Sequence, residues 1–139
     1  MARIRIYTDS GADLEQYVID QYQVNMFHMQ VTMNDVTYRN SLQITPKEFY
    51  RLIAETGVIP VTAQITPLDF KNEFKRVLRE SDDEVIYIAF SSALSGTYQA
   101  ACMVRDQLAS NKITVIASKA ASVGCGLIMI RGAEAVLAG

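Results

Sequence analysis

The stretch "EVIYIAFSSALSGTYQA", residues 84–100, joins an almost continuous apolar run to a serine-rich loop and then to a helical pattern. A second apolar run, "KITVIAS" at residues 112–118, is also followed by a helical pattern. Continuous rather than alternating apolar runs are typical of strands that crossover helices cover on both faces. The sequence therefore predicts an α/β fold, with a doubly wound, mostly parallel sheet and helices on both faces.

The flanking sequence supplies further elements of the same fold. "RIRIYT" (residues 3–8) predicts a strand, which "DSGAD" separates from a helix over residues 14–22. Residues 24–33 predict a second strand, and "NDVTY" (34–38) predicts a turn with a short returning strand. A mostly apolar last helix over residues 125–137 is expected to need cover on more than one side.

Two helix starts share one design, "TPKEF" at residues 45–49 and "TPLDF" at residues 66–70. In each, a threonine precedes a proline at the first helical position, and an acid three residues after the threonine can reach back to it. Between them, Gly57 and Pro60 keep the connector over residues 56–65 out of a helix. We predict two capped helices that are joined by a non-helical connector.

Composition limits the classes of protein to consider. The 139 residues, 50% of them hydrophobic, predict a single domain over residues 1–139. Thirteen basic and fifteen acidic residues give a formal net charge of −2, which argues against a nucleic-acid partner. No apolar run reaches the ~20 residues of a membrane-spanning helix. Cys102 and Cys125 form neither a CxxC pair nor a metal set, so we predict packing roles, no metal and a reducing, cytoplasmic setting.

Hydroxyl groups follow three of the predicted strands, at the sheet edge where open parallel sheets bind their ligands. The hydroxyl-bearing residues are Thr8 and Ser10 in the first loop, Ser91, Ser92 and Ser95 in the second, and Ser118 and Ser122 in the third. Because Gly96 permits a close approach of the backbone, the second loop is suited to donating hydrogen bonds to an anionic oxygen. The alternative is that these residues are ordinary turn and helix caps.

Catalytic patterns are weak. The sequence contains no G-x-x-x-x-G-K-[ST] and no G-x-G-x-x-G after the first strand, which disfavours a nucleotide ligand. A serine nucleophile needs a base, and the only histidine is His28, which we expect to be structural and to share a strand face with Met26 and Gln30. Asp9 and Asp13 can be considered as an acid and base pair, but a capping role is favoured. No catalytic constellation stands out in the sequence.

Four motifs, taken together, resemble the DegV family of bacterial fatty-acid-binding proteins. They are "YTDSGADL" at residues 7–14, "ITPKEFY" at 44–50, "SSALSGTY" at 91–98 and "SKAASVGCGL" at 118–127. They occur in the family's order and span nearly the whole chain. The resemblance implies an α/β first domain, followed in the family by a second domain that closes over the acyl chain and that we expect to be absent from this chain.

The resemblance also implies a ligand and a partner. The carboxylate of a long-chain fatty acid would be held by Thr62 and Ser95, with Gly96, Ser10 and Ser92 completing the predicted ligand-binding set. The bound fatty acid would be presented to a separate fatty-acid kinase, which makes an acyl phosphate for phospholipid synthesis, and no cofactor is expected.

Three departures from the family pattern bear on lipid selectivity. The usual "TSQPS" is "TAQIT" here, with Ala63 and Ile65 in place of a serine and a proline, while Ala117 replaces an aspartate and Ala93 a glycine. Two other functions stay open: an enzyme that uses the serine loop on a small phosphorylated substrate, and an isolated half without ligand. Five methionines are candidates either for an adaptable acyl pocket or for the core, namely Met26, Met29, Met33, Met103 and Met129.

Overall fold

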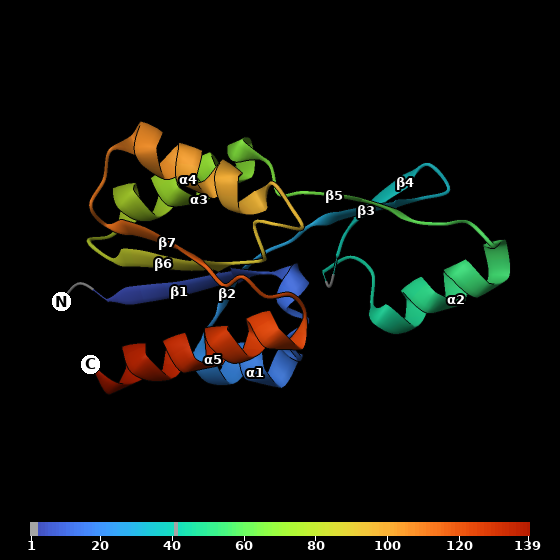
Figure 1. Cartoon of the computed structure of the whole chain (residues 1–139), viewed down its shortest axis with the longest axis horizontal. Coiled ribbons are helices and arrows are strands. Elements are labelled where there is room, and N and C mark those ends of the chain that lie inside the picture. The colour runs from blue at the N-terminus through green and yellow to red at the C-terminus, as the bar shows by residue number, and fades with distance from the viewer. Residues whose placement is uncertain (1–2, 41) are drawn as a thin grey trace.

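A four-stranded parallel sheet forms the centre of the larger part of the molecule (Figure 1). The computed structural model describes residues 3–40 and 42–139. The strands are β1 (Ile4–Asp9), β2 (Asn25–Phe27), β6 (Glu84–Ala89) and β7 (Ile113–Ala117), in the order β2-β1-β6-β7. All three pairings are parallel, which confirms the predicted α/β fold class.

Helices cover both faces of this sheet (Figure 1). On one face lie α1 (Gln16–Tyr22) and α5 (Val123–Ala138), and on the other lie α3 (Pro67–Glu80) and α4 (Thr97–Leu108). We call the parallel sheet with these four helices the body. The chain winds from β1 outward to β2 and later from β6 outward to β7, so strand order reverses between β1 and β6. In open α/β sheets, ligands bind at the carboxyl ends of the strands beside such a switch point.

The core of the body is aromatic on the side of α3 and α4. The ring of Phe27 lies 4.5 Å from that of Phe70, 5.4 Å from Tyr7 and 5.5 Å from Tyr87, measured between centroids. Phe74 and Val77 of α3 add fully buried side chains to this cluster. Large rings in contact contribute both buried apolar area and favourable edge and tilted geometry, so this cluster holds α3 on the sheet.

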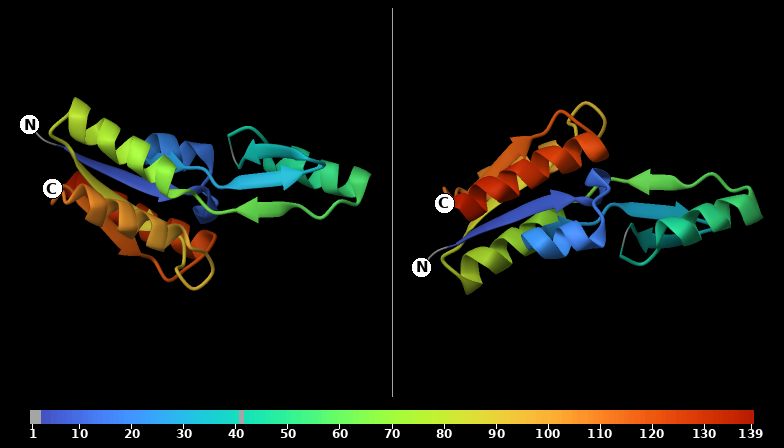
Figure 2. Two further views of the ribbon diagram at one scale, coloured as in Figure 1. Left: turned by 90° about the horizontal axis from the view of Figure 1, so that it is seen from above. Right: turned by 90° about the horizontal axis from the view of Figure 1, so that it is seen from below.

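A second, smaller unit projects from the body and is here called the arm (Figure 2). It consists of β3 (Gln30–Met33), β4 (Val36–Arg39), α2 (Pro46–Thr56) and β5 (Val61–Ala63), and its strands form an antiparallel sheet in the order β4-β3-β5. Asn34 and Asp35 join β3 to β4 with φ values of 49° and 60°. Two residues with positive φ suit the right-handed twist of a tight hairpin, so the predicted turn and returning strand are confirmed.

One prediction about the strands was wrong. Residues 24–33 form two strands rather than one, because β2 ends at Phe27 in the parallel sheet and β3 begins at Gln30 in the antiparallel sheet. Apolar periodicity does not reveal that a strand changes partners part-way. The connector is non-helical after Gly57, as predicted, but it also contains β5, which pairs with β3 and places Thr62 opposite Val31.

The helix predictions were more accurate. Both capping boxes form, at Thr45 for α2 and Thr66 for α3, each with a proline in the first turn. α1 begins at Gln16 rather than at residue 14, because residues Ser10–Ala12 form a 3-10 turn, η1. α5 begins at Val123, two residues before its predicted start. Within the described ranges, no helix has the length and apolar character needed to cross a membrane.

The cysteines and methionines are distributed between core and surface. Cys125 is buried and Cys102 is half-buried against the core, which agrees with packing roles. Met33 and Met129 are buried, whereas Met103 is 45% exposed on α4. Burial raises the pKa of the Cys125 thiol, and a thiol held in its neutral form is a poor nucleophile and metal ligand.

Candidate functional site

A hollow of about 650 Å³ lies at the switch point, where the body faces the arm. Its lining comes from η1, the link between β2 and β3, the end of β5, the β6–α4 loop and the β7–α5 loop. Three of these segments directly follow β1, β6 and β7. We call it the switch-point hollow, because it occupies the position at which this class of sheet binds its ligands.

Thr62 and Ser95 lie in the lining of this one hollow, although 33 positions separate them along the chain. Thr62 is the middle residue of β5 and is exposed. Its pairing with Val31, which is buried, fixes the backbone of Thr62 in the arm sheet. Ser95 and Gly96 belong to the β6–α4 loop on the opposite side. The structure thus brings together three of the five predicted ligand-binding residues.

The hydroxyl of Ser95 is positioned by the start of α4. Its Oγ accepts a hydrogen bond from the Thr97 amide at 3.2 Å and lies 2.9 Å from the Thr97 Oγ1. The Thr97 side chain is fully buried, and its hydroxyl can donate to Ser95. In that arrangement both acceptor positions of Ser95 are used internally, and its proton is available to a ligand in the hollow.

Position 96 needs a glycine because a side chain there would meet Gln64, and not because its backbone angles are unusual. It precedes α4 with φ −74° and ψ 1°, which other residues also adopt. A Cβ at this position would collide with Oε1 of Gln64 and would lie 3.1 Å from its Cδ. The carboxamide of Gln64 therefore rests directly on Gly96, across the hollow from β5.

Ser10 and Ser92, the other two predicted ligand-binding residues, do not line the hollow. Ser10 is buried, and its Oγ accepts a hydrogen bond from the Met29 amide at 3.0 Å, which ties η1 to the link between β2 and β3. Ser92 is half-buried, and its carbonyl accepts a 3.4 Å hydrogen bond from Gln99 on α4. Both contacts support the shape of the loops around the site.

Ser122 lines the hollow from the third loop and was not in the predicted set. It precedes α5 with φ 51° and ψ −133°, a conformation that a residue with a side chain seldom adopts. Its amide donates to the Gly11 carbonyl at 2.8 Å, which joins the third loop to the first. Ser122 had appeared among the hydroxyls at the strand ends, but its strained backbone leaves no signature in the sequence. Backbone strain persists where surrounding contacts fix it, often at functional sites.

The electrostatic character of the hollow is close to neutral. Among the residues that line it, the only ionisable side chain is the exposed Asp13. Hydroxyls and amides supply the donors, and α4 and α5 both begin at its edge. Helix N-termini carry unpaired amides and partial positive charge. This environment can hold one negatively charged group through neutral donors.

Asp9 acts beneath the hollow as a structural carboxylate. It accepts hydrogen bonds from the Tyr87 hydroxyl at 2.6 Å, the Phe90 amide at 2.9 Å and the Gly11 amide at 3.1 Å. Burial raises the pKa of Asp9, while these three donors act in the opposite direction. The predicted capping role is confirmed for Asp9, which caps η1 and also joins the ends of β1 and β6. Asp13 ends η1 through its backbone, with a φ of 48°, and not through a side-chain cap.

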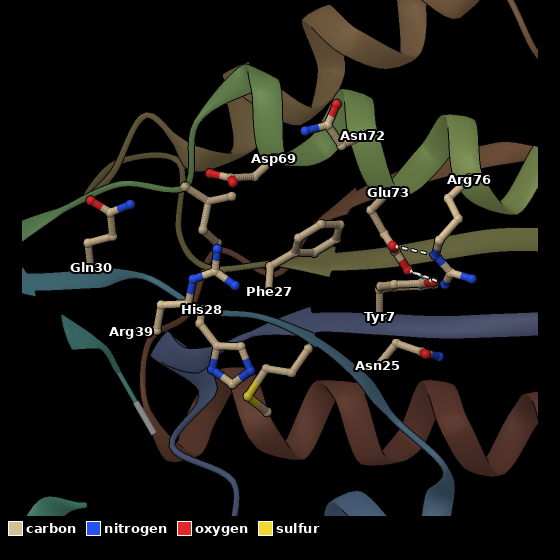
Figure 3. A pocket seen from close by; sticks show the side chains of 12 residues that line it. Tyr7, Asn25, Phe27, His28, Gln30, Arg39, Asp69, Asn72, Glu73 and Arg76 are labelled. Carbon is tan, nitrogen blue, oxygen red and sulfur yellow. Dashed lines mark hydrogen bonds and ion pairs between the residues drawn. The ribbon is translucent and has the colours of Figure 1, made fainter. Parts of the chain in front are cut away.

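A second hollow, of about 440 Å³, lies beside β2 and α3 and contains His28 (Figure 3). Met26 and Gln30 line it with His28, although His28 falls after the end of β2 rather than in a continuous strand. The Nδ1 of His28 lies 2.7 Å from the Asn40 carbonyl, in keeping with a structural histidine. His28 does not line the switch-point hollow, so it is not placed as a base for Ser95.

The charged groups at the other end of this second hollow are paired with one another (Figure 3). The Tyr7 hydroxyl donates to Glu73 at 2.6 Å, and Arg76 binds Glu73 at 2.7 Å and Glu80 at 2.9 Å. Hydrogen bonding from Arg76 lowers the pKa of Glu73, and burial together with the bond to Glu73 raises the pKa of Tyr7. These groups satisfy each other and need no ligand.

The family assignment rests on the sequence as a whole. A family model described as an uncharacterised protein of the DegV family matches residues 3–139. The chain belongs to the DegV family. A DegV domain-containing protein of Clostridium perfringens is 35% identical over the whole chain and 50% of its own length. One of Caldanaerobacter subterraneus is 34% identical over the whole chain and 49% of its own length.

Solved DegV structures share the fold. A DegV family protein of Thermus thermophilus, described by its fatty-acid binding, matches with a TM-score of 0.84 at 33% identity, covering 99% of this chain and 48% of its own. DegV of Bacillus subtilis, described as a fatty acid binding protein, matches with a TM-score of 0.89 at 27% identity, covering 100% of this chain and 49% of its own. The chain therefore spans about half the length of the relatives that it matches.

Proposed function

We propose that this chain binds the carboxylate of a long-chain fatty acid in the switch-point hollow, with Thr62 and Ser95 as hydrogen-bond donors beside Gly96. The observation that carries the proposal is that Thr62 and Ser95, from arm and body, line one hollow at the switch point. The fatty-acid binding described for the DegV proteins of Thermus thermophilus and Bacillus subtilis supports the choice of ligand.

The chemistry of the hollow suits a single carboxylate. A carboxylate that leaves water is tolerated only where donors replace its hydration. The Ser95 proton and the Thr62 hydroxyl are such donors, and hydrogen bonds to a charged group are stronger than those between neutral groups. The start of α4 adds the partial positive charge of a helix N-terminus. Ser122 adds a third hydroxyl from the opposite loop.

We propose further that this chain supplies the head-group half of a larger site. Apolar side chains are exposed in the lining of the hollow and on the helix that follows its third loop: Leu94 lines the hollow and is 68% exposed, and Val123 and Leu127 are exposed at the start of α5. An acyl chain that leaves a polar head-group site needs apolar cover, and such a surface is suited to contact with it or with further protein. In this proposal the second half of a DegV-length protein covers the acyl chain.

The remaining part of the proposal concerns the partner. The bound fatty acid would be presented to a separate fatty-acid kinase, and this chain would act as a binding protein rather than as a catalyst. The lining of the hollow contains no histidine, lysine or cysteine, and its one ionisable side chain is the exposed Asp13, which supports the second statement.

Extraction of the purified protein followed by mass spectrometry tests the ligand class. We expect a co-purified fatty acid. A phosphorylated metabolite instead would favour an enzyme acting through the serine loop, and an empty protein would favour an isolated half without ligand binding.

Titration with a fluorescent long-chain fatty acid tests the residues. It is carried out on the chain itself and on a fusion that adds the second half of a DegV relative. Ser95→Ala removes one hydrogen bond to a charged group, so we expect affinity to fall about ten- to a hundredfold. Ser92→Ala, whose side chain lies outside the hollow, is the matched control and should bind like the parent. Equal affinity of Ser95→Ala and the parent, at equal thermal stability, would overturn the assignment.

A further inference from the structure

Gln64 lines the switch-point hollow without an assigned role. It directly follows β5 and is exposed, whereas the next residue, Ile65, is buried in the core of the body. The residue before Gln64, Ala63, is fixed by its pairing with Gln30 in the arm sheet. The backbone of Gln64 is therefore held at both flanks, and its side chain extends into the hollow.

The seat of the Gln64 carboxamide is Gly96. A Cβ at Gly96 would collide with Oε1 of Gln64 and lie 3.1 Å from Cδ and 3.3 Å from Nε2, so the carboxamide rests on the glycine with its oxygen nearest. Because the backbone of Gly96 has a negative φ, this contact is the feature that requires a residue without a side chain. Gln64 and Gly96 thus form a matched pair across the hollow.

A carboxamide at this place has the right chemistry for a carboxylate. Its NH₂ group offers two donors and no charge, and half a turn about the last side-chain bond exchanges NH₂ and oxygen. The hollow already contains one acidic side chain, Asp13, and a bound carboxylate would bring a second negative charge. A neutral amide at position 64 can donate to that carboxylate, whereas an acidic side chain there would repel it. Gln64 comes from the arm wall beside Thr62 and reaches the body wall beside Ser95.

We propose that Gln64 is a further carboxylate-positioning residue, which Gly96 seats so that its NH₂ group donates to the second oxygen of the head group. This inference rests on the proposed fatty-acid function of the same hollow. Thr62 and Ser95 supply hydroxyl donors from the two walls, and Gln64 supplies an amide donor between them. Its role is selective for the ionised acid, because a neutral ester presents no charge to stabilise.

The test compares three substitutions at one position with matched probes. The probes are a fluorescent long-chain fatty acid and its methyl ester. Gln64→Ala should bind the acid about tenfold more weakly than the parent. Gln64→Glu keeps the size but adds a negative charge, so it should bind the acid more weakly still and the ester about as well as the parent. Gln64→Asn, which is too short to reach the seat, should behave like Gln64→Ala.

Two controls separate this inference from the function on which it rests. Gln107→Ala removes an exposed glutamine from α4 away from the hollow and should bind like the parent. Ser95→Ala reports on the site itself. If Ser95→Ala binds more weakly and all three Gln64 variants bind the acid like the parent, the inference on Gln64 fails and the proposed function stands. If the parent binds no fatty acid, or Ser95→Ala binds like the parent, the proposed function fails and this inference with it.

The seat is tested by a double-mutant cycle. Gly96→Ala should displace the carboxamide, which is the flexible end of its side chain, with little loss of thermal stability. Its effect on affinity should therefore largely disappear when Gln64 is already alanine, because the two changes remove the same contact. Fully additive losses in affinity would overturn the pairing of Gln64 with Gly96.

Discussion

Helices α2 and α3 begin with the same capping motif but differ in how much of each is buried. Both start with Thr-Pro, and both complete a capping box in which the threonine accepts from the amide three residues on. In α3 three side chains are buried completely, whereas in α2 none is buried. The comparison teaches that capping signals decide where a helix starts, while contacts with the rest of the fold decide how much it contributes to stability.

The same contrast separates body from arm. The body encloses a continuous aromatic cluster around Phe27, whereas Val31, Met33 and Ile44 are the hydrophobic residues of the described part of the arm that are buried. An arm with so little buried apolar area depends on the body, or on a ligand and further protein, for its order. The site lies between the two, so binding should stabilise the arm more than the body.

The largest expected effect compares one phenylalanine from each helix. Phe74→Ala in α3 removes a completely buried ring and should lower the free energy of unfolding by about 3–5 kcal/mol. Phe49→Ala in α2 removes a half-buried ring that contacts Tyr50, and should lower it by less than about 1 kcal/mol. Urea unfolding followed by circular dichroism measures both. Equal losses would mean that α2 is packed as tightly as α3, and the contrast would be wrong.

The two caps give a smaller and more specific comparison. Thr45→Ala and Thr66→Ala each remove one bond to an amide, 3.3 Å to Glu48 and 3.2 Å to Asp69, with an expected local cost of about 1 kcal/mol. In α3 this cost should appear in global unfolding, because the helix is part of the core. In α2 it should appear only as faster amide hydrogen exchange within the helix. A drop in global stability for Thr45→Ala equal to that for Thr66→Ala would show that the arm and body unfold as one unit.

The sequence was sufficient to predict most elements of the body and, in the arm, the turn after β3 and the start of α2, but not how the strands of the arm pair. Continuous apolar runs at β6 and β7 indicate a buried parallel sheet, and the capping boxes mark helix starts, because these signals are local. The division of residues 24–33 between two sheets, and the pairing of β5 with β3, depend on contacts between distant segments. No periodicity within a single segment carries that information.

The same limit applies to the site. Thr62, Ser95 and Gly96 were placed in one set by resemblance, and the structure brings them together. The seat of Gln64 on Gly96 is a contact across the hollow, so neither residue reveals it alone.

Acid unfolding should distinguish an ion pair of the body from one of the arm. The amide of Arg3 and the guanidinium of Arg5, at 3.0 and 2.7 Å, lower the pKa of Asp83 to about 2. A carboxyl whose pKa is lower in the folded state stabilises above its ordinary value of about 4 and loses that contribution as pH falls toward 2.

Asp83→Asn should therefore reduce the fall in stability between about pH 4 and pH 2, measured by thermal unfolding across that range. In the arm, Arg51 and Glu55 pair at 2.8 Å with more than half of each side chain exposed. Glu55→Gln is the control and should leave the acid profile unchanged, because exposed pairs contribute little. A parallel profile for Asp83→Asn and the parent would contradict the assignment.

The smallest expected change concerns Ser122, which lies on the body side of the hollow in a strained backbone conformation. Glycine adopts this conformation without steric cost, which relieves strain on the order of 1–3 kcal/mol, but it also increases the freedom of the unfolded chain by roughly 0.5–1 kcal/mol. Ser122→Gly should therefore raise the free energy of unfolding by about 1 kcal/mol, the middle of a net range of roughly 0 to 2.5 kcal/mol. Ser122→Ala keeps the strain and removes the same hydroxyl, so it should leave stability near that of the parent.

Both variants should lose the same affinity for a fluorescent fatty acid if the hydroxyl is a donor to the head group. A loss of affinity in Ser122→Gly alone would instead show that this residue contributes through the rigid geometry of its loop. The body wall and the arm wall of the hollow would then differ in stiffness rather than in the hydrogen-bond donors that they supply.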